Sequence, residues 1–351
     1  MVVQRPTPWL RGPLWDTALI AFPWVPICAW LLFGLGFASG TAPIASRPEF
    51  RVALTAILAL TFLHRQYVFL LVYGDRRTFA LRPRAFVVVP CVLAAIGLMV
   101  LVGRARWPFL LPILLASVGA WNVWHTLMQR YGLLRVYAAR AGGKATSPAR
   151  ARLDRAVLWA TVALVVTSLV ARPALLLDHP TTVRIITLTA PLWDGPAARI
   201  ALAVALVTWL ALASTWLRAE LRSTGPRAPR LVFMGSTIAL FAVFVVGGPV
   251  LGYLTFGAAH ALEYVAFVHH TATKKYQAGG APIASVFRTP ALAFGLMLLV
   301  PAIYATLDGR GITALAGYVV YEATTAIAHF VFDGWVWKVR SPSVATAAVA
   351  E

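Results

Sequence analysis

The sequence predicts an all-α fold, a polytopic integral-membrane helix bundle of about ten transmembrane helices with both termini cytoplasmic. Hydrophobic residues make up 60% of the 351-residue chain and charged residues only 12%, whereas a soluble domain carries about 25% charge. The mean hydropathy is +0.76. Apolar runs of roughly 20 residues, long enough to cross a bilayer as a helix, recur along the whole length.

Ten apolar runs qualify as spans when the chain is read in order. The seventh and eighth runs meet at VVGGPVLG, where Gly-Gly-Pro should break the helix. No hydrophilic stretch in the sequence is long enough for a separate soluble domain, so we expect residues 1–351 to form a single transmembrane domain. The expected spans are 17–39, 52–73, 85–103, 108–129, 156–177, 197–217, 231–248, 250–272, 290–307 and 312–337, with ends uncertain by a few residues.

The distribution of basic residues favours this topology. With a cytoplasmic N-terminus, 22 of the 31 Lys and Arg fall in cytoplasmic segments and eight in outside segments, while Arg65 falls within a span. Such a bias is what the positive-inside rule requires. The segment 130–155 contains AGGKATSPAR and is expected to be a flexible cytoplasmic linker. The net charge of +19 is thereby explained by the loops, so we expect membrane lipids and no nucleic acid as partners.

Four predicted spans each carry a histidine in the half nearest the cytoplasm. His64 lies ten residues before Gly74, roughly 15 Å deep at 1.5 Å per residue. His329 lies nine residues before Lys338, at a similar depth. The four histidines are His64, His125, His260 and His329.

Carboxylates accompany two of these histidines. In YEATTAIAHFVFD, Glu322, His329 and Asp333 are spaced by seven and then four residues, which places them on one helical face. In HALEYVAFVHH, Glu263 follows His260 by three residues and precedes His270 by seven, again on one face. A charged group near the bilayer centre costs about 3 kcal/mol, and a bound cation would offset that cost.

Imidazole and carboxylate together suit iron, zinc, copper and manganese. We expect a divalent metal, with iron favoured, and the number of candidates leaves room for one or two ions. Glu322 and Glu263 are the expected catalytic residues, Glu322 in proton transfer and Glu263 as a ligand or a partner of one. The expected metal ligands are His64, His125, His260, His270, His329 and Asp333.

Singly placed histidines on apolar helices near the cytoplasmic face resemble the integral-membrane, histidine-ligated non-haem iron enzymes. This class includes desaturases, hydroxylases and multi-span carotenoid-cleaving oxygenases. Desaturases carry clustered histidine boxes, whereas the only doublet here is His269-His270 and the other intramembrane histidines stand singly. Singly placed histidines are closer to the carotenoid-cleaving type. The resemblance implies O2-dependent oxidation of a lipid-soluble substrate, in lipid metabolism, with an electron-donor protein as a further partner.

Three other functions also fit the pattern. Intramembrane histidines and carboxylates form proton relays in transporters, and a Gly-Gly-Pro break is a transporter feature. Paired histidines bind b-type haem, and a water-activating zinc site would serve a membrane hydrolase. Our leading hypothesis is a metal-dependent oxidoreductase in the cell membrane, with its active site toward the cytoplasmic leaflet.

Overall fold

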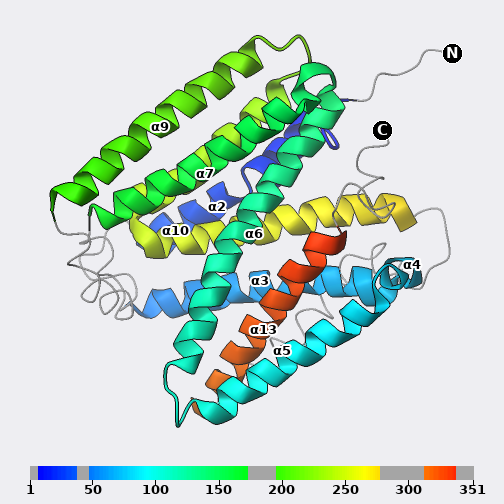
Figure 1. Ribbon diagram of the computed structural model, residues 1–351, viewed down its shortest axis with the longest axis vertical. Coiled ribbons are helices and arrows are strands. Elements are labelled where there is room, and N and C mark those ends of the chain that lie inside the picture. Colours follow the sequence, from blue (N-terminus) through cyan, green and yellow to red (C-terminus); the bar gives the residue numbers. More distant parts are fainter. Residues whose placement is uncertain (1–6, 38–46, 173–194, 277–311, 337–351) are drawn as a thin grey trace. The chain divides into compact units, whose positions relative to one another are not determined.

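The computed structural model describes residues 7–37, 47–172, 195–276 and 312–336, and every regular element within these ranges is helical (Figure 1). Within these ranges, six helices are long and apolar enough to cross a membrane, or seven if a bent N-terminal pair forms one span. This agrees with the predicted all-α membrane protein. The six are α3 (Pro48–Gly74), α5 (Pro83–Gly103), α6 (Leu110–Ala141), α7 (Pro148–Val170), α9 (Pro196–Leu221) and α10 (Ala228–Tyr276).

The expected first span is broken. It consists of α1 (Pro13–Trp15), a π-helical segment Asp16–Ala21, α2 (Trp24–Ala29) and a second π-helical segment Trp30–Gly34. Its two halves meet at a bend of 47°. The bend coincides with Pro23, which cannot donate a helical hydrogen bond.

The expected helix break at VVGGPVLG is confirmed. α10 has one non-helical residue, Gly248, with φ 83° and ψ 171°, and Pro249 follows it. Only glycine adopts such a positive φ without strain. The two spans predicted at 231–248 and 250–272 are therefore the two segments of one interrupted helix.

The predicted flexible linker over 130–155 is wrong. α6 continues to Ala141 and α7 begins at Pro148, so that only a short connection separates them. Gly142 ends α6 with φ +68°, a common helix terminator. Ser147 caps α7 by accepting a hydrogen bond from the Arg150 amide. Six of the seven basic residues of this segment lie on the adjoining ends of α6 and α7, and a run of basic residues at helix ends resembles a loop in the sequence.

Of the last two expected spans, 290–307 and 312–337, the structure describes only the second. The expected span at 312–337 corresponds to the helix α13 (Ile312–Val336), which is not among the six candidate spans of the described residues. A short helix, α4 (Arg76–Ala80), follows α3. The expected span at 290–307 lies outside the described residues.

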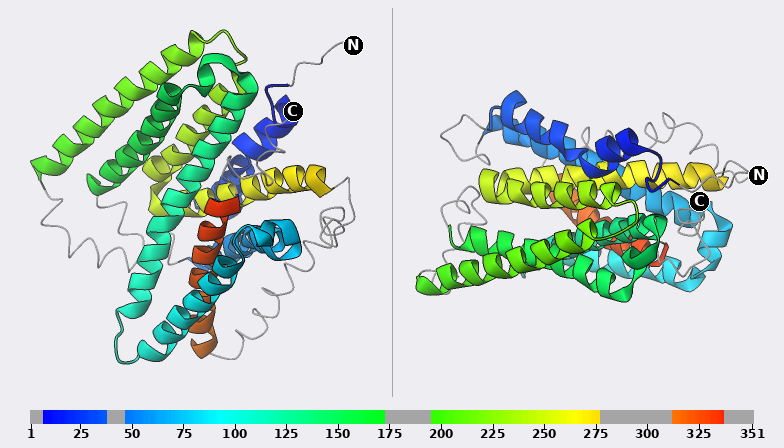
Figure 2. Two further views of the ribbon diagram at one scale, coloured as in Figure 1. Left: turned by 45° about the vertical axis from the view of Figure 1, so that its right-hand side comes forward. Right: turned by 90° about the horizontal axis from the view of Figure 1, so that it is seen from above.

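The described helices divide into two compact units, and the boundary passes through α3, α6 and α10. The first unit comprises Met1–Leu58 and Gln129–Glu263, and the second Ala59–Met128 and Tyr264–Glu351. In the first unit α7 and α9 lie side by side, and in the second α5 and α13 do (Figures 1 and 2). That the chain forms a single transmembrane domain stays a prediction.

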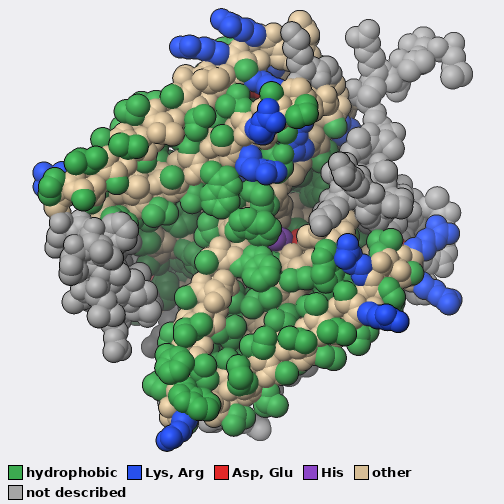
Figure 3. All heavy atoms as spheres, in the orientation of Figure 1, with side chains coloured by type: hydrophobic (Ala, Val, Ile, Leu, Met, Phe, Trp, Pro, Cys, Tyr) green, Lys and Arg blue, Asp and Glu red, His purple; other side chains and the backbone are tan. Residues whose placement is uncertain are grey.

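The outward faces of individual helices are strongly apolar. Exposed side chains of α5 include Val87, Leu98 and Val102, and those of α9 include Ile200 and Val207. Figure 3 shows hydrophobic side chains along these helices and basic ones near helix ends. Apolar surface on this scale is typical of helices that face lipid.

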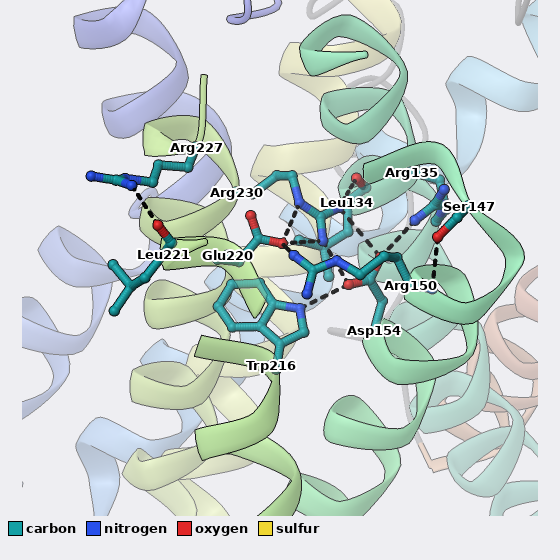
Figure 4. Close-up of polar contacts among 10 residues, drawn as sticks. All are labelled: Leu134, Arg135, Ser147, Arg150, Asp154, Trp216, Glu220, Leu221, Arg227 and Arg230. Carbon is teal, nitrogen blue, oxygen red and sulfur yellow. Dashed lines mark hydrogen bonds and ion pairs between the residues drawn. The ribbon is translucent and has the colours of Figure 1, made fainter. Parts of the chain in front are cut away.

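The first unit contains a buried network of charges (Figure 4). Arg230 Nη2 lies 2.7 Å from Asp154 Oδ1 and 2.8 Å from Glu220 Oε1. Arg135 also pairs with Asp154, at 2.8 Å, and Arg150 pairs with Glu220. The loop charge count assigns all three arginines to cytoplasmic segments, because the sequence does not show which basic residues form ion pairs with buried carboxylates.

Trp216→Phe should destabilise the protein through this network. The Trp216 indole donates to Asp154 Oδ1 at 2.8 Å, and hydrogen bonds to buried charged groups contribute about 1.5–3 kcal/mol. The matched control is Trp209→Phe on the same helix, which removes a 2.9 Å bond to the neutral Thr161 hydroxyl and should cost about 1 kcal/mol. Unfolding in mixed micelles measures both. Equal costs would contradict the role assigned to the network.

Candidate metal centre

Three histidines and one aspartate come together within the second unit. His64 lies on α3, His125 on α6, and His329 and Asp333 on α13. All four side chains are buried. α13 is held against α5, where a Cβ on Gly97 would lie only 3.0 Å from Val320 Cγ1. This close approach of two helices fixes the position from which α13 presents His329 and Asp333.

The carboxylate of Asp333 lies against two imidazoles. Its Oδ2 is 3.4 Å from His329 Nε2 and 3.5 Å from His125 Nε2. These separations exceed the usual 2.7–3.2 Å of an N–H···O hydrogen bond. Two ligand atoms at about 2.1 Å from a tetrahedral metal are about 3.4 Å apart. The spacing therefore matches the edge of a metal coordination shell.

A ligand atom from each of His125, His329 and Asp333 lies within 4.8 Å of the others. This is a two-histidine, one-carboxylate donor set, which is characteristic of non-haem Fe(II) oxygenases when further coordination positions stay open. Zinc and manganese accept the same donors. The group can hold a metal ion, and metal binding itself stays a prediction.

The ring of His64 packs edge-on against that of His329, with centroids 4.7 Å apart. The rings of His125 and His329 are also edge-on, at 5.1 Å. A ring nitrogen of His64 lies within 4.8 Å of one of His329. His64 is thus next to the group as a further potential ligand.

Glu322, an expected catalytic residue, is paired with Arg65. The guanidinium contacts the Glu322 carboxylate, donates to its backbone carbonyl at 2.7 Å, and reaches the Thr325 hydroxyl at 3.2 Å. Arg65 is buried, so it does not extend to a membrane surface as an isolated snorkelling arginine would. The ion pair explains how α13 accommodates Glu322 without a metal.

Glu263, the second expected catalytic residue, lies in the first unit. Its carboxylate is 2.7 Å from Arg130 Nη2 and accepts a 3.3 Å bond from Gln129. Arg130 also donates to the Thr237 hydroxyl at 2.8 Å. Both partners are fully buried, which places Glu263 in a structural ion pair.

The other two expected ligands stay predictions. His260 is buried on α10 in the first unit, one turn before Tyr264 on the same helix. His270 is half-buried near the end of that helix. His270 is not part of the group formed by His125, His329 and Asp333.

Sequence reasoning missed Tyr264, which contacts three members of the site. Its hydroxyl donates to Asp333 Oδ1 at 2.7 Å, and its ring packs edge-on against His64 and His329. The available signal was its position one turn after His260 on the histidine-bearing helix. Tyrosine in a membrane helix is more commonly interpreted as an interfacial aromatic.

Comparison with known proteins finds no match to a family model, to a curated protein or to a solved structure.

Proposed function

We propose that this protein is a membrane oxidoreductase that uses a non-haem metal, with iron favoured, to oxidise a lipid-soluble substrate with O2. The observation that supports the proposal is the placement of Asp333 Oδ2 at coordination-edge distance from both His125 and His329. The reaction would be hydroxylation, desaturation or oxidative cleavage, in lipid metabolism, and an electron-donor protein would supply reducing equivalents where the reaction needs them.

In this proposal the side chains divide into ligands and supporting groups. His125, His329 and Asp333 would hold the metal, which would supply O2 activation at its open positions. His64 would be a further ligand or would orient His329. Phe330, whose ring lies 4.6 Å from that of His125, would shield the site from water on the side facing that ring. His260, His270 and Glu263 enter only as untested candidates.

The finer topology belongs to the same proposal: ten spans, both termini cytoplasmic, and the centre in the cytoplasmic leaflet of the cell membrane. The loop charge bias supports it. So does the length of the candidate span within α10, Ala228–Thr273, at 46 residues. About 20 helical residues cross a bilayer, so an interrupted helix of that length is long enough for two crossings.

A proton-coupled transporter is the alternative with specific support. α10 is interrupted at Gly248, and the buried pairs Arg65–Glu322 and Arg130–Glu263 are of the kind that proton relays use. A b-type haem is less compatible with the geometry. A porphyrin plane must pass between its two axial rings, and edge-on rings at 4.7 and 5.1 Å leave no room for it.

The test is metal analysis together with an absorption spectrum of the protein purified in detergent. Stoichiometric iron without a Soret band supports the proposal. Zinc in place of iron would redirect it toward a hydrolase, and a Soret band would establish haem. Protein that stays metal-free after incubation with Fe(II), Zn(II) and Mn(II) would refute the metal centre and favour transport.

A further inference from the structure

Tyr264, which is not one of the expected ligands, contacts Asp333 and two of the histidines at once. It is buried, its hydroxyl donates to Asp333 Oδ1 at 2.7 Å, and its ring lies against His64 and His329 at centroid distances of 5.5 and 5.2 Å. It sits in an apolar cluster with Leu63, Leu71 and Val268, and close packing of this kind limits the movement of the ring.

The two oxygens of Asp333 are thereby given different roles. Oδ1 accepts the Tyr264 hydroxyl, while Oδ2 lies 3.4 and 3.5 Å from the two imidazole nitrogens. A carboxylate can bind a metal through one oxygen or through both. A hydrogen bond to Oδ1 favours binding through Oδ2 alone, because a second metal bond at Oδ1 would compete with the phenol.

We propose that Tyr264 is a positioning residue of the metal centre, which holds Asp333 so that it binds a divalent metal through Oδ2 only. The inference rests on the proposed function. It adds that the Tyr264 phenol, which is not itself a ligand, controls the coordination number of the metal. The phenol thereby also controls how many positions are left for O2 and substrate. Partners that orient ligands in this way typically contribute 10–100-fold to metal affinity.

The test uses Co(II) as the probe, bound to detergent-purified wild type and to Tyr264→Phe. The variant keeps the ring and loses only the hydroxyl, so we expect its Kd for Co(II) to rise about tenfold. We also expect its visible absorption band to weaken and shift, since release of Oδ1 allows Asp333 to bind through both oxygens and raises the coordination number. A merely structural hydroxyl would alter stability without changing this band.

Tyr73→Phe is the matched control. Tyr73 lies on α3 in the same unit and donates a 2.6 Å bond to the Phe86 carbonyl, so the variant loses a tyrosine hydroxyl and its hydrogen bond nine residues from His64. Its Co(II) affinity and band should equal those of wild type. If Tyr264→Phe fails to fold, Tyr264→Leu, which suits the apolar cluster, takes its place.

The outcomes separate the two proposals. Wild type that binds Co(II) together with a Tyr264 variant of equal affinity and identical band would overturn the role of Tyr264 and leave the metal centre intact. Wild type that binds no Co(II) would overturn both. A weakened affinity with a changed band in the Tyr264 variant, and neither change in Tyr73→Phe, supports the inference.

Discussion

Replacing His329 with alanine is expected to remove bound metal while leaving a folded protein. His329 is fully buried and is the shared member of the site: it lies beside Asp333, His125 and His64. Its loss removes one of the three donors in the His125, His329 and Asp333 group, and two remaining donors hold a divalent ion poorly. Metal per protein, measured after size-exclusion chromatography, should fall at least tenfold.

The control for this variant is His269→Ala. His269 lies on α10, is half-buried, and is expected from its spacing to point away from the face that carries His260 and Glu263. Its metal content should match wild type. Folded His329→Ala protein with undiminished metal would disprove the centre. Loss of metal in both variants would trace the effect to general destabilisation.

The sequence predicted the helical class and the six candidate spans of the described residues, because an apolar run of fixed length leaves a bilayer-spanning helix few alternatives. The break at Gly248 also followed, since Gly-Pro chemistry is local. The extension of α6 through Arg130 to Ala141 was not predicted from the sequence. From the sequence alone, a basic residue after an apolar run is assigned to the membrane interface. Only a partner distant in the sequence, such as Glu263 for Arg130, reveals that it is buried.

The candidate site shows the same division. Helical spacing placed His329 and Asp333 on one face of α13, and depth grouped His64 with His125 and His329, three residues that the structure brings together. Spacing could not tell which carboxylate belongs to the histidines. Glu322 shares the face of Asp333 in the sequence pattern, yet it pairs with Arg65. The choice depends on which side chains of α3 and α6 lie opposite each turn of α13.

The Arg65–Glu322 pair should behave as a structural unit in a double-mutant cycle. On the sequence alone, removal of the Glu322 charge would ease membrane insertion by about 3 kcal/mol. With Arg65 opposite, the same change strands a buried guanidinium that also contacts the Glu322 carbonyl and Thr325. Breaking a buried pair by removing one partner costs about 3–5 kcal/mol. We therefore expect Glu322→Met and Arg65→Met each to destabilise the protein by that amount.

The double variant Arg65→Met/Glu322→Met should recover most of the lost stability, because apolar side chains replace both charges and neither is left unpaired. Unfolding in mixed micelles gives the coupling free energy. Additive costs in the double variant would show that the two side chains act separately.

Metal content adds a second readout: the double variant should keep its metal, since the ligand group consists of His125, His329 and Asp333. A double variant that is stable and loaded with metal, but slow in turnover, would assign proton transfer to Glu322. One that is stable and has lost its metal would place the ion pair within the centre itself.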